Sequence, residues 1–379
     1  MLILSTVYNG STVTSMRYIT GIIMKKMKKF TALALTVILA LGALTACGST
    51  GNSGNEKDAS VTPSAAAEAE STKEPTAEAA ADPTEAATQD LVHVRFSAFN
   101  GITSAGLRYG LEKGIFKKAG VDLELVEVDD KIAALASNST DMADVNTSQA
   151  IVAAHSGAAF KLVSSMFRTK GAFHLIANPS IKSIADLKGK KIGIAIKGSG
   201  LELTVLEILD QNGIKPGDVT LIANGAYQQA YASLVAGQVD ATVIHEPFVT
   251  IGEKEGKAKL LALGWDYVPD LNTGVIVAGD KIISENPDAV KKVIQGYVDS
   301  YNYAKENWED YIKWSAKYLN LDEEVVRSAY EREDVIWKND PNIDLDSINK
   351  TQELQKKWGF QDEVFDVTPY VDLSFLPNK

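Results

Sequence analysis

The amino-acid sequence predicts an α/β protein with two lobes, each a mostly parallel sheet flanked by helices. Two stretches, 91–150 and 190–250, follow one plan of strand, helix, strand, helix and strand. Right-handed crossovers make the three strands of such a unit parallel and cover the sheet with helices. We therefore expect two similar open sheets, related by descent or by convergence; chance similarity of generic units is the alternative.

Matching turns support this repeat. The opening strands, 92–96 and 191–196, each run into a turn rich in Gly, Ser or Asn and then into a helical pattern. Asn138 and Gly237 stand where the second helix of each unit should end. A left-handed residue is common there, and Gly and Asn tolerate that conformation best. Asp141 and Asp240 then lead into the third strand of each unit.

Composition excludes several classes of function. The 379 residues carry a net charge of −11, whereas phosphate binding needs clustered Lys and Arg, so we expect no nucleic-acid partner. A single cysteine excludes an intrachain disulfide, a CxxC redox pair and a multi-cysteine metal site. Neither HExxH spacing, a GxSxG elbow nor a Walker A loop occurs. We therefore expect a protein that is not an enzyme and has no metal or cofactor.

The N-terminal region predicts export and a lipid anchor. A basic run at 24–29 precedes an apolar run at 30–44, which is short for a membrane span. The sequence LTACG at 44–48 looks like a bacterial lipobox, in which the thiol of Cys47 accepts diacylglycerol. We interpret 1–47 as upstream residues plus a lipoprotein signal peptide; a plain signal peptide or a short anchor helix is the alternative.

The next segment, 48–90, is composed of Ala, Glu, Ser, Thr, Pro and Gly with almost no large apolar residue. Such a stretch cannot bury enough apolar surface to offset its ordering entropy, so it predicts a flexible acidic tether. We assign 91–170 and 274–379 to lobe I and 171–273 to lobe II. A strand at 272–278 leads the chain back to lobe I, and 280–360 is mostly helical.

Three segments resemble a known family of ABC-importer binding proteins. They are 179–193, which contains DLKGKK, then 237–241, and the run Glu246-Pro247-Phe248. The family includes binding proteins for aliphatic sulfonates, taurine, nitrate and thiamin-pyrimidine precursors. The resemblance implies a two-lobe type II periplasmic-binding fold with a double crossover hinge that closes on its ligand. It further implies an extracytoplasmic monomer that delivers a small solute to importer permease subunits, and the LTACG sequence at Cys47 adds the lipid anchor to this expectation.

The resemblance also brings an enzymatic alternative. Enzymes that make the thiamin pyrimidine share this fold, but they resemble one another through a cysteine-rich motif, and 91–379 contains no cysteine. A structural surface lipoprotein is the other alternative. Ligand-dependent stabilisation of the purified protein would separate a binding protein from that last class.

Ligands in open α/β sheets bind outside the carboxyl ends of the strands, which face each other when two lobes meet. The predicted ligand-binding residues follow those ends and are Phe99, Asn100, Thr103, Thr147, Ser148, Ser199, Gly200, Glu202, Asn224, Tyr227 and Glu246. Hydroxyls and amides at helix starts suit an oxyanion, although the same residues also serve as simple caps.

The charge of the ligand is left open by the sequence. The carboxylates of Glu202 and Glu246 favour an amine, an amide or a pyrimidine over a small dianion. Lys197 and Arg168 are the only cations near the candidate loops. The ring of Phe99 and that of Tyr227 could each lie against a ligand, and the Tyr227 hydroxyl could donate to it.

Overall fold

The computed structural model describes residues 91–166 and 170–377. All of these residues belong to one compact unit of the chain, 84–379. The predicted signal peptide, Cys47, the predicted tether and Arg168 lie outside the described residues. Within the described ranges, no helix combines the length and the apolar composition needed to cross a bilayer.

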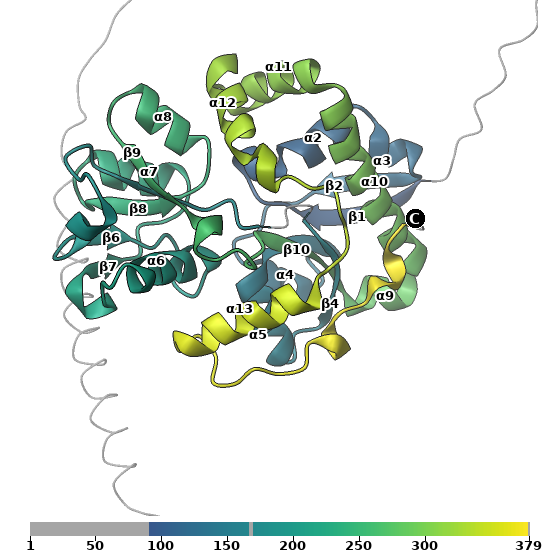
Figure 1. Cartoon of the computed structure of the whole chain (residues 1–379). Helices are drawn as coiled ribbons and strands as arrows, with labels where there is room; N and C mark the ends of the chain where they lie inside the picture. The colour runs from purple at the N-terminus through teal and green to yellow at the C-terminus, as the bar shows by residue number, and fades with distance from the viewer. Residues whose placement is uncertain (1–90, 167–169, 378–379) are drawn as a thin grey trace, which may run out of the picture. The chain divides into compact units, whose positions relative to one another are not determined.

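Two five-stranded sheets form the framework (Figure 1). The sheet of lobe I has the order β2-β1-β3-β10-β4, and that of lobe II has the order β7-β6-β8-β5-β9. In lobe I the strands are β1 (Val92–Ser97), β2 (Val121–Leu125), β3 (Met142–Asn146), β4 (Phe160–Ser165) and β10 (Gly274–Gly279). In lobe II they are β5 (His174–Ala177), β6 (Lys191–Gly193), β7 (Thr220–Ile222), β8 (Ala241–Ile244) and β9 (Lys259–Leu263).

The predicted α/β fold with two mostly parallel units is confirmed. The strands β1, β2 and β3 pair in parallel, as do β6, β7 and β8. In each sheet the strand that enters from the other lobe, β10 or β5, pairs antiparallel with both neighbours. The first strand of the second unit is shorter than the predicted 191–196, because the chain turns at Ala195, which has φ +57°.

Helices cover both sheets. Lobe I carries η1 (Gly101–Ser104), α2 (Ala105–Glu112), α3 (Ile115–Lys118), α4 (Lys131–Ala136) and α5 (Thr147–His155). Lobe II carries η2 (Ile184–Leu187), α6 (Gly200–Gln211), η3 (Pro216–Asp218), α7 (Gln228–Val235), α8 (Phe248–Lys254) and η4 (Gly264–Asp266). The C-terminal part consists of α9 (Asp280–Glu285), α10 (Pro287–Glu306), α11 (Trp308–Leu319), α12 (Glu323–Glu333), η5 (Asp334–Ile336), α13 (Leu345–Lys357), η6 (Thr368–Tyr370) and η7 (Leu373–Phe375).

The repeat extends to individual hydrogen bonds. Asp141 Oδ2 accepts from the backbone N of Arg95 at 2.9 Å, and Asp240 Oδ2 accepts from the backbone N of Lys191 at 2.8 Å. Each aspartate amide donates back to the carbonyl of the same partner. Two aspartates at equivalent positions therefore fix the start of the third strand against the first strand in both lobes.

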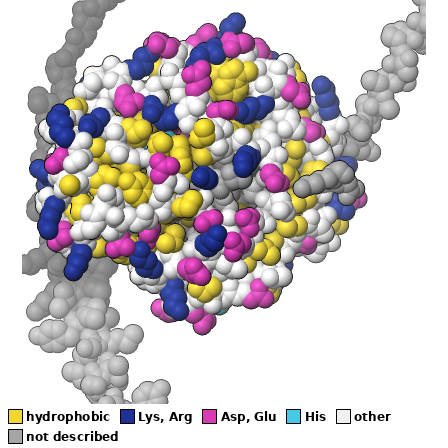
Figure 2. Space-filling view, viewed as in Figure 1, with side chains coloured by type: hydrophobic (Ala, Val, Ile, Leu, Met, Phe, Trp, Pro, Cys, Tyr) yellow, Lys and Arg dark blue, Asp and Glu magenta, His cyan; other side chains and the backbone are white. Residues whose placement is uncertain are grey.

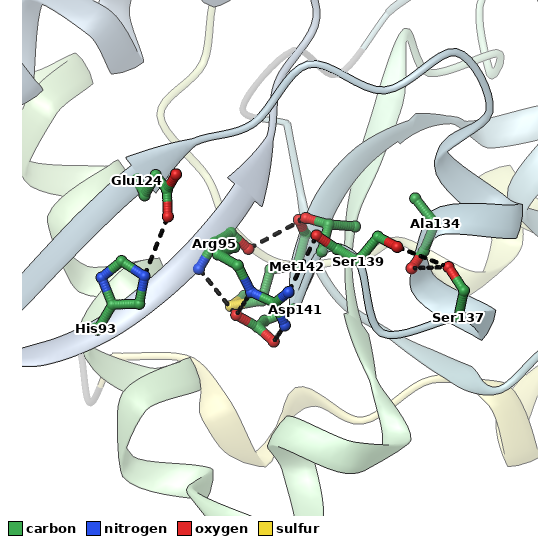
Figure 3. Close-up of polar contacts among 9 residues, drawn as sticks. His93, Arg95, Glu124, Ala134, Ser137, Ser139, Asp141 and Met142 are labelled. Carbon is green, nitrogen blue, oxygen red and sulfur yellow. Dashed lines mark hydrogen bonds and ion pairs between the residues drawn. The ribbon is translucent and has the colours of Figure 1, made fainter.

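Lobe I reinforces this junction with a side-chain pair (Figure 3). The Arg95 guanidinium donates to Asp141 through Nε at 3.1 Å and Nη2 at 2.6 Å, and to the Ser139 carbonyl through Nη1 at 3.2 Å. Asn138, just before Ser139, has φ +55°, and its counterpart Gly237 in lobe II has φ +70°. The predicted left-handed helix ends are thus confirmed in both units.

Two C-terminal helices contact both lobes. α12 contributes Val326 and Tyr330 to the core of lobe I and also packs against α8 of lobe II. α13 packs against α5 of lobe I, while Trp358, just after it, packs on the core of lobe II. Figure 1 shows α12 toward the top and α13 toward the bottom of the view, on either side of β10. The two lobes are therefore joined on two sides, in addition to the crossovers.

The α13 contact is polar as well as apolar. Lys357 Nζ donates to Glu207 Oε1 and to Asp210 Oδ2, both at 2.7 Å, and the Trp358 indole donates to the same Glu207 oxygen at 2.6 Å. Glu207 is buried on α6, so these donors satisfy a carboxylate that would otherwise be costly to bury.

Candidate functional site

A small cavity of about 140 Å³ lies between the two lobes. Its walls come from the carboxyl ends of strands in both sheets and from the two crossovers. The lining residues are Phe99, Thr103, Asn146, Gln149, Phe173, Ile196, Ser199, Leu201, Ala226, Tyr227, His245 and Thr273. This is the place where the strand ends of two facing open sheets are expected to bind a ligand.

The repeat relates the two sides of the cavity. Thr103 and Ser199 each lie eight residues after the paired first-strand residue, Arg95 or Lys191. Asn146 lies five residues after Asp141, and His245 lies five residues after Asp240, the equivalent aspartate of the other unit. Equivalent positions of the two units therefore meet across one cavity, and the different side chains at those positions make its two sides chemically different.

Aromatic rings form much of the lobe II wall. The Tyr227 and His245 rings stack with centroids 5.2 Å apart and planes 20° apart. The Phe173 ring meets His245 edge-on at 5.3 Å. Tyr227 also adopts φ +53°, a conformation that a non-glycine residue rarely takes and that proteins tend to retain at functional sites. These rings offer flat apolar faces to a ligand.

The polar groups of the cavity differ in whether they already form hydrogen bonds within the protein. The Thr103 hydroxyl is buried and has no hydrogen-bond partner among the described residues. The Ser199 hydroxyl, by contrast, donates to the Ile196 carbonyl at 2.5 Å and accepts from the Glu202 amide at 3.4 Å. Ser199 therefore caps α6, and Thr103 is the hydroxyl that remains for a ligand.

Asn146 links the lobes at the cavity. Its Oδ1 caps α5 by accepting from the Ser148 amide at 3.1 Å, and it also accepts from the Gly200 amide of lobe II at 3.4 Å. The crossovers are linked too, because Thr273 Oγ1 accepts from the Ala172 amide at 3.1 Å. Hydrogen bonds between the lobes and between the crossovers therefore lie beside the cavity.

A buried ion pair behind the cavity positions Phe99. Asp144 Oδ1 accepts from the Phe99 amide at 2.7 Å and from Lys131 Nζ at 2.5 Å. Lys131 Nζ also lies 3.8 Å from the centroid of the Phe99 ring, a cation–π contact. Burial raises the pKa of the Asp144 carboxyl, and Lys131 and the Phe99 amide act in the opposite direction. The pair holds both the backbone and the ring of Phe99.

The cavity lining is uncharged in the described part of the chain: it contains histidine but no Asp, Glu, Lys or Arg. The outer surface is different, since Figure 2 shows acidic and basic side chains interspersed over the face in view. A larger groove of about 840 Å³ between α8 and α11–α12 has charged walls, including Lys254, Lys317 and Glu323, and lies away from the strand ends.

Four of the eleven predicted ligand residues line the cavity: Phe99, Thr103, Ser199 and Tyr227. The other three in lobe I do not line it. Asn100 Oδ1 accepts from Arg108 Nη2 at 3.2 Å. Thr147 and Ser148 point into lobe I, where their hydroxyls are buried and lack a hydrogen-bond partner among the described residues.

The remaining lobe II residues have other contacts. Gly200 donates its amide to Asn146, as above. Glu202 Oε2 accepts from the Gly198 amide at 2.6 Å and borders a neighbouring groove. Asn224 accepts from the Ala195 amide and donates to Thr242, which fixes the loop after β6. Glu246 is fully buried against Arg332 and Thr250.

Several lining residues were not predicted. Asn146 and His245 each precede a predicted residue, Thr147 or Glu246, by one position. Because side-chain direction alternates along a strand, following that alternation to the strand end could have identified them. Phe173 and Thr273 lie in the crossovers, where no local pattern indicates which side chain faces the cavity.

Comparisons with known proteins agree with this architecture. A family model described as NMT1/THI5-like matches residues 102–310, more than half of the chain. A binding protein of Brucella abortus is 28% identical over 216 residues, which are 56% of this chain and 66% of that protein. The 4-amino-5-hydroxymethyl-2-methylpyrimidine phosphate synthase of Candida albicans is 24% identical over 222 residues, covering 52% of this chain and 64% of the enzyme. The chain thus spans just under two thirds of these relatives.

Solved structures show the same fold. The ligand-binding component of an ABC-type import system from Staphylococcus aureus gives a TM-score of 0.64 at 19% identity, covering 75% of this chain and 97% of that one. The alkanesulfonate-binding protein of Xanthomonas axonopodis pv. citri gives 0.62 at 20% identity, covering 75% and 99%. The fold is that of periplasmic binding proteins, and the chain belongs to the NMT1/THI5-like family.

Proposed function

We propose that this protein is the solute-binding component of an ABC importer and that it captures a small solute whose flat, uncharged ring lies between its lobes. The observation that carries the proposal is the cavity at the strand ends of both lobes, with stacked aromatic walls and an unused Thr103 hydroxyl. The Staphylococcus aureus neighbour, which is a component of an import system, supports the importer role.

Size favours a single ring. An engineered protein cavity of about 150 Å³ lined by apolar side chains binds benzene, and the cavity here has about 140 Å³. The stacked Tyr227 and His245 rings suit the face of a heterocycle, and Thr103 suits a ring nitrogen or an exocyclic amine. The Candida albicans relative is named for a compound with such a ring, an aminopyrimidine.

An oxyanion fits this cavity less well. The N-terminus of α6 is the place where an anion would gain most from free amides. That end already holds the Glu202 carboxylate, which accepts from the Gly198 amide at 2.6 Å. Among the described residues, the cavity lining also supplies no Lys or Arg to pair with a sulfonate or nitrate.

Ligand affinity should depend on the aromatic wall and on one hydroxyl. We expect Tyr227→Ala and Thr103→Val each to weaken binding of 4-amino-5-hydroxymethyl-2-methylpyrimidine by about 1–3 kcal/mol. Isothermal titration calorimetry measures this, with Tyr227→Phe, which keeps the ring, as the matched control. Methanesulfonate serves as the oxyanion probe. Tight binding of methanesulfonate with no binding of the pyrimidine would overturn the ring proposal.

The enzymatic alternative has a distinct signature. The Candida albicans relative is a synthase, so a shared catalytic activity would convert a substrate and release a product. We expect native mass spectrometry of the purified protein to show a bound small molecule that is released unchanged by denaturation. A bound molecule that is converted into a compound of different mass during incubation would favour the enzyme instead.

We further propose that lipid on Cys47 holds the protein at the outer face of the cell membrane, as the LTACG sequence indicates. Cys47→Ser should leave the protein uncleaved or release it from the membrane, because only the thiol accepts the diacylglycerol. Membrane fractionation and mass spectrometry of the N-terminal peptide measure this, with Ser49→Ala as the control. A Cys47→Ser protein that still carries the normal lipid would exclude this anchor.

A further inference from the structure

A second groove of about 380 Å³ adjoins the cavity. Gln149, on α5, lines both spaces. The loop between β6 and α6 also borders both, because Lys197 lines the groove and Ser199, two residues later, lines the cavity. One side chain and one loop therefore separate the two spaces, so that a single ligand could occupy both.

The walls of the groove are apolar with a charge at one side. Val152 and Ala153 on the same face of α5 and Phe360 after α13 supply the apolar surface. Lys197 supplies the cation, and within the described residues its ammonium makes no hydrogen bond or ion pair. Glu202 also borders the groove, but its carboxylate is buried and accepts from the Gly198 amide. The groove thus offers methylene-sized apolar contacts and one unused positive charge.

We propose that the natural solute has two parts: a single-ring head in the cavity and a short chain ending in an acid, which lies in the groove with the acid at Lys197. This inference rests on the proposed ring-binding function and specifies its substrate class. The cavity alone is smaller than the roughly 300–1,000 Å³ of most small-molecule sites, and the groove supplies the missing space.

The chemistry of each part follows from its surroundings. A ring gains contact with Tyr227 and His245, whose faces are apolar and flat. A methylene chain gains from leaving water along Val152 and Phe360. A carboxylate or sulfonate at the end of that chain meets an ammonium that has no competing partner among residues 91–166 and 170–377, which makes a charge-assisted hydrogen bond available.

Three probes that differ only in the tail test the proposal on the full chain in detergent. They are 4-amino-2-methylpyrimidine, its 5-linked propanoic acid and the corresponding propanamide. Calorimetry on the unaltered protein should give the acid roughly twofold to fivefold tighter binding than the amide, as expected for an ion pair at an exposed lysine. Lys197→Met should remove that difference and leave the affinity of the bare ring unchanged, and Lys197→Glu should reverse it. Lys117→Met, which removes an exposed lysine of α3, is the matched control and should change nothing.

The outcomes separate this inference from the function on which it rests. Equal affinities for ring, acid and amide would overturn the two-part ligand while leaving ring binding intact. An acid preference that survives Lys197→Met would also overturn the two-part ligand, because Lys197 would then not be the group that binds the acid. Failure of all three probes to bind would overturn the ring-binding function together with the inference.

Discussion

Arg332→Ala is expected to lower the free energy of unfolding by about 3–5 kcal/mol, because it leaves a buried carboxylate without its cation. Arg332 Nε donates to Glu246 Oε1 at 2.6 Å, and Nη2 donates to Glu253 Oε2 at the same distance. The Glu246 side chain is 0% exposed and that of Arg332 is 24% exposed. The pair joins α12 to lobe II, so its loss should also weaken the contact between lobes.

Arg327 provides a matched control on the same helix. It pairs with Glu309 at 2.7 Å, but the Glu309 side chain is 67% exposed. Exposed pairs contribute about 0–1 kcal/mol, so Arg327→Ala should cost no more than that. Chemical denaturation of both variants measures the difference. Equal losses in the two proteins would show that burial of Glu246 does not set the energy of this contact.

The loss should also depend on pH. Burial raises the pKa of Glu246 above its ordinary value of 4.5, the nearby His174 lowers it and Glu333 raises it again. Removing Arg332 takes away a cation and raises that pKa further. A carboxyl with a raised folded-state pKa contributes full stability below its unfolded pKa and loses it as the pH rises through the folded-state value. The difference between the unaltered protein and Arg332→Ala should therefore shrink as the pH falls toward about 4.5.

The second large effect is expected at Asp144. Asp144→Ala removes the carboxylate that accepts from both the Phe99 amide and Lys131 Nζ. It leaves a Lys131 side chain that is only 17% exposed, with the backbone carbonyl of residue 144 as its remaining acceptor there. We expect a loss of about 3–5 kcal/mol of unfolding free energy. Ring-ligand affinity should fall as well, since Phe99 lines the cavity and would lose the contact that fixes its backbone.

A double-mutant cycle distinguishes positioning from simple destabilisation. Asp144→Asn keeps an oxygen for the Phe99 amide but removes the charge, whereas Lys131→Met removes the cation alone. Lys131→Met should cost less than Asp144→Ala, because Asp144 can take up a proton and its pKa is already raised by burial. The double variant Asp144→Asn/Lys131→Met should lose less unfolding free energy than the sum of its two single variants. It should also keep most of the ligand affinity. Strictly additive losses would contradict an interacting pair.

Local patterns in the sequence determined the fold and the position of the site. The alternation of strands and helices predicted two parallel units, and the left-handed positions at Asn138 and Gly237 followed from helix-end chemistry. The location of a site at the strand ends follows from the direction of parallel strands, and Phe99, Thr103, Ser199 and Tyr227 do line a cavity there. These features depend on residues close together in the chain.

Only the tertiary structure decided which side chains face the ligand and which join the lobes. Asn146 rather than Thr147, and His245 rather than Glu246, face the cavity, because one step at a strand end reverses the side-chain direction. Glu246 instead meets Arg332, 86 residues later, and Asp144 meets the Phe99 amide on a neighbouring strand. Such pairs form between segments far apart in sequence, and neither partner carries a local signal of the other.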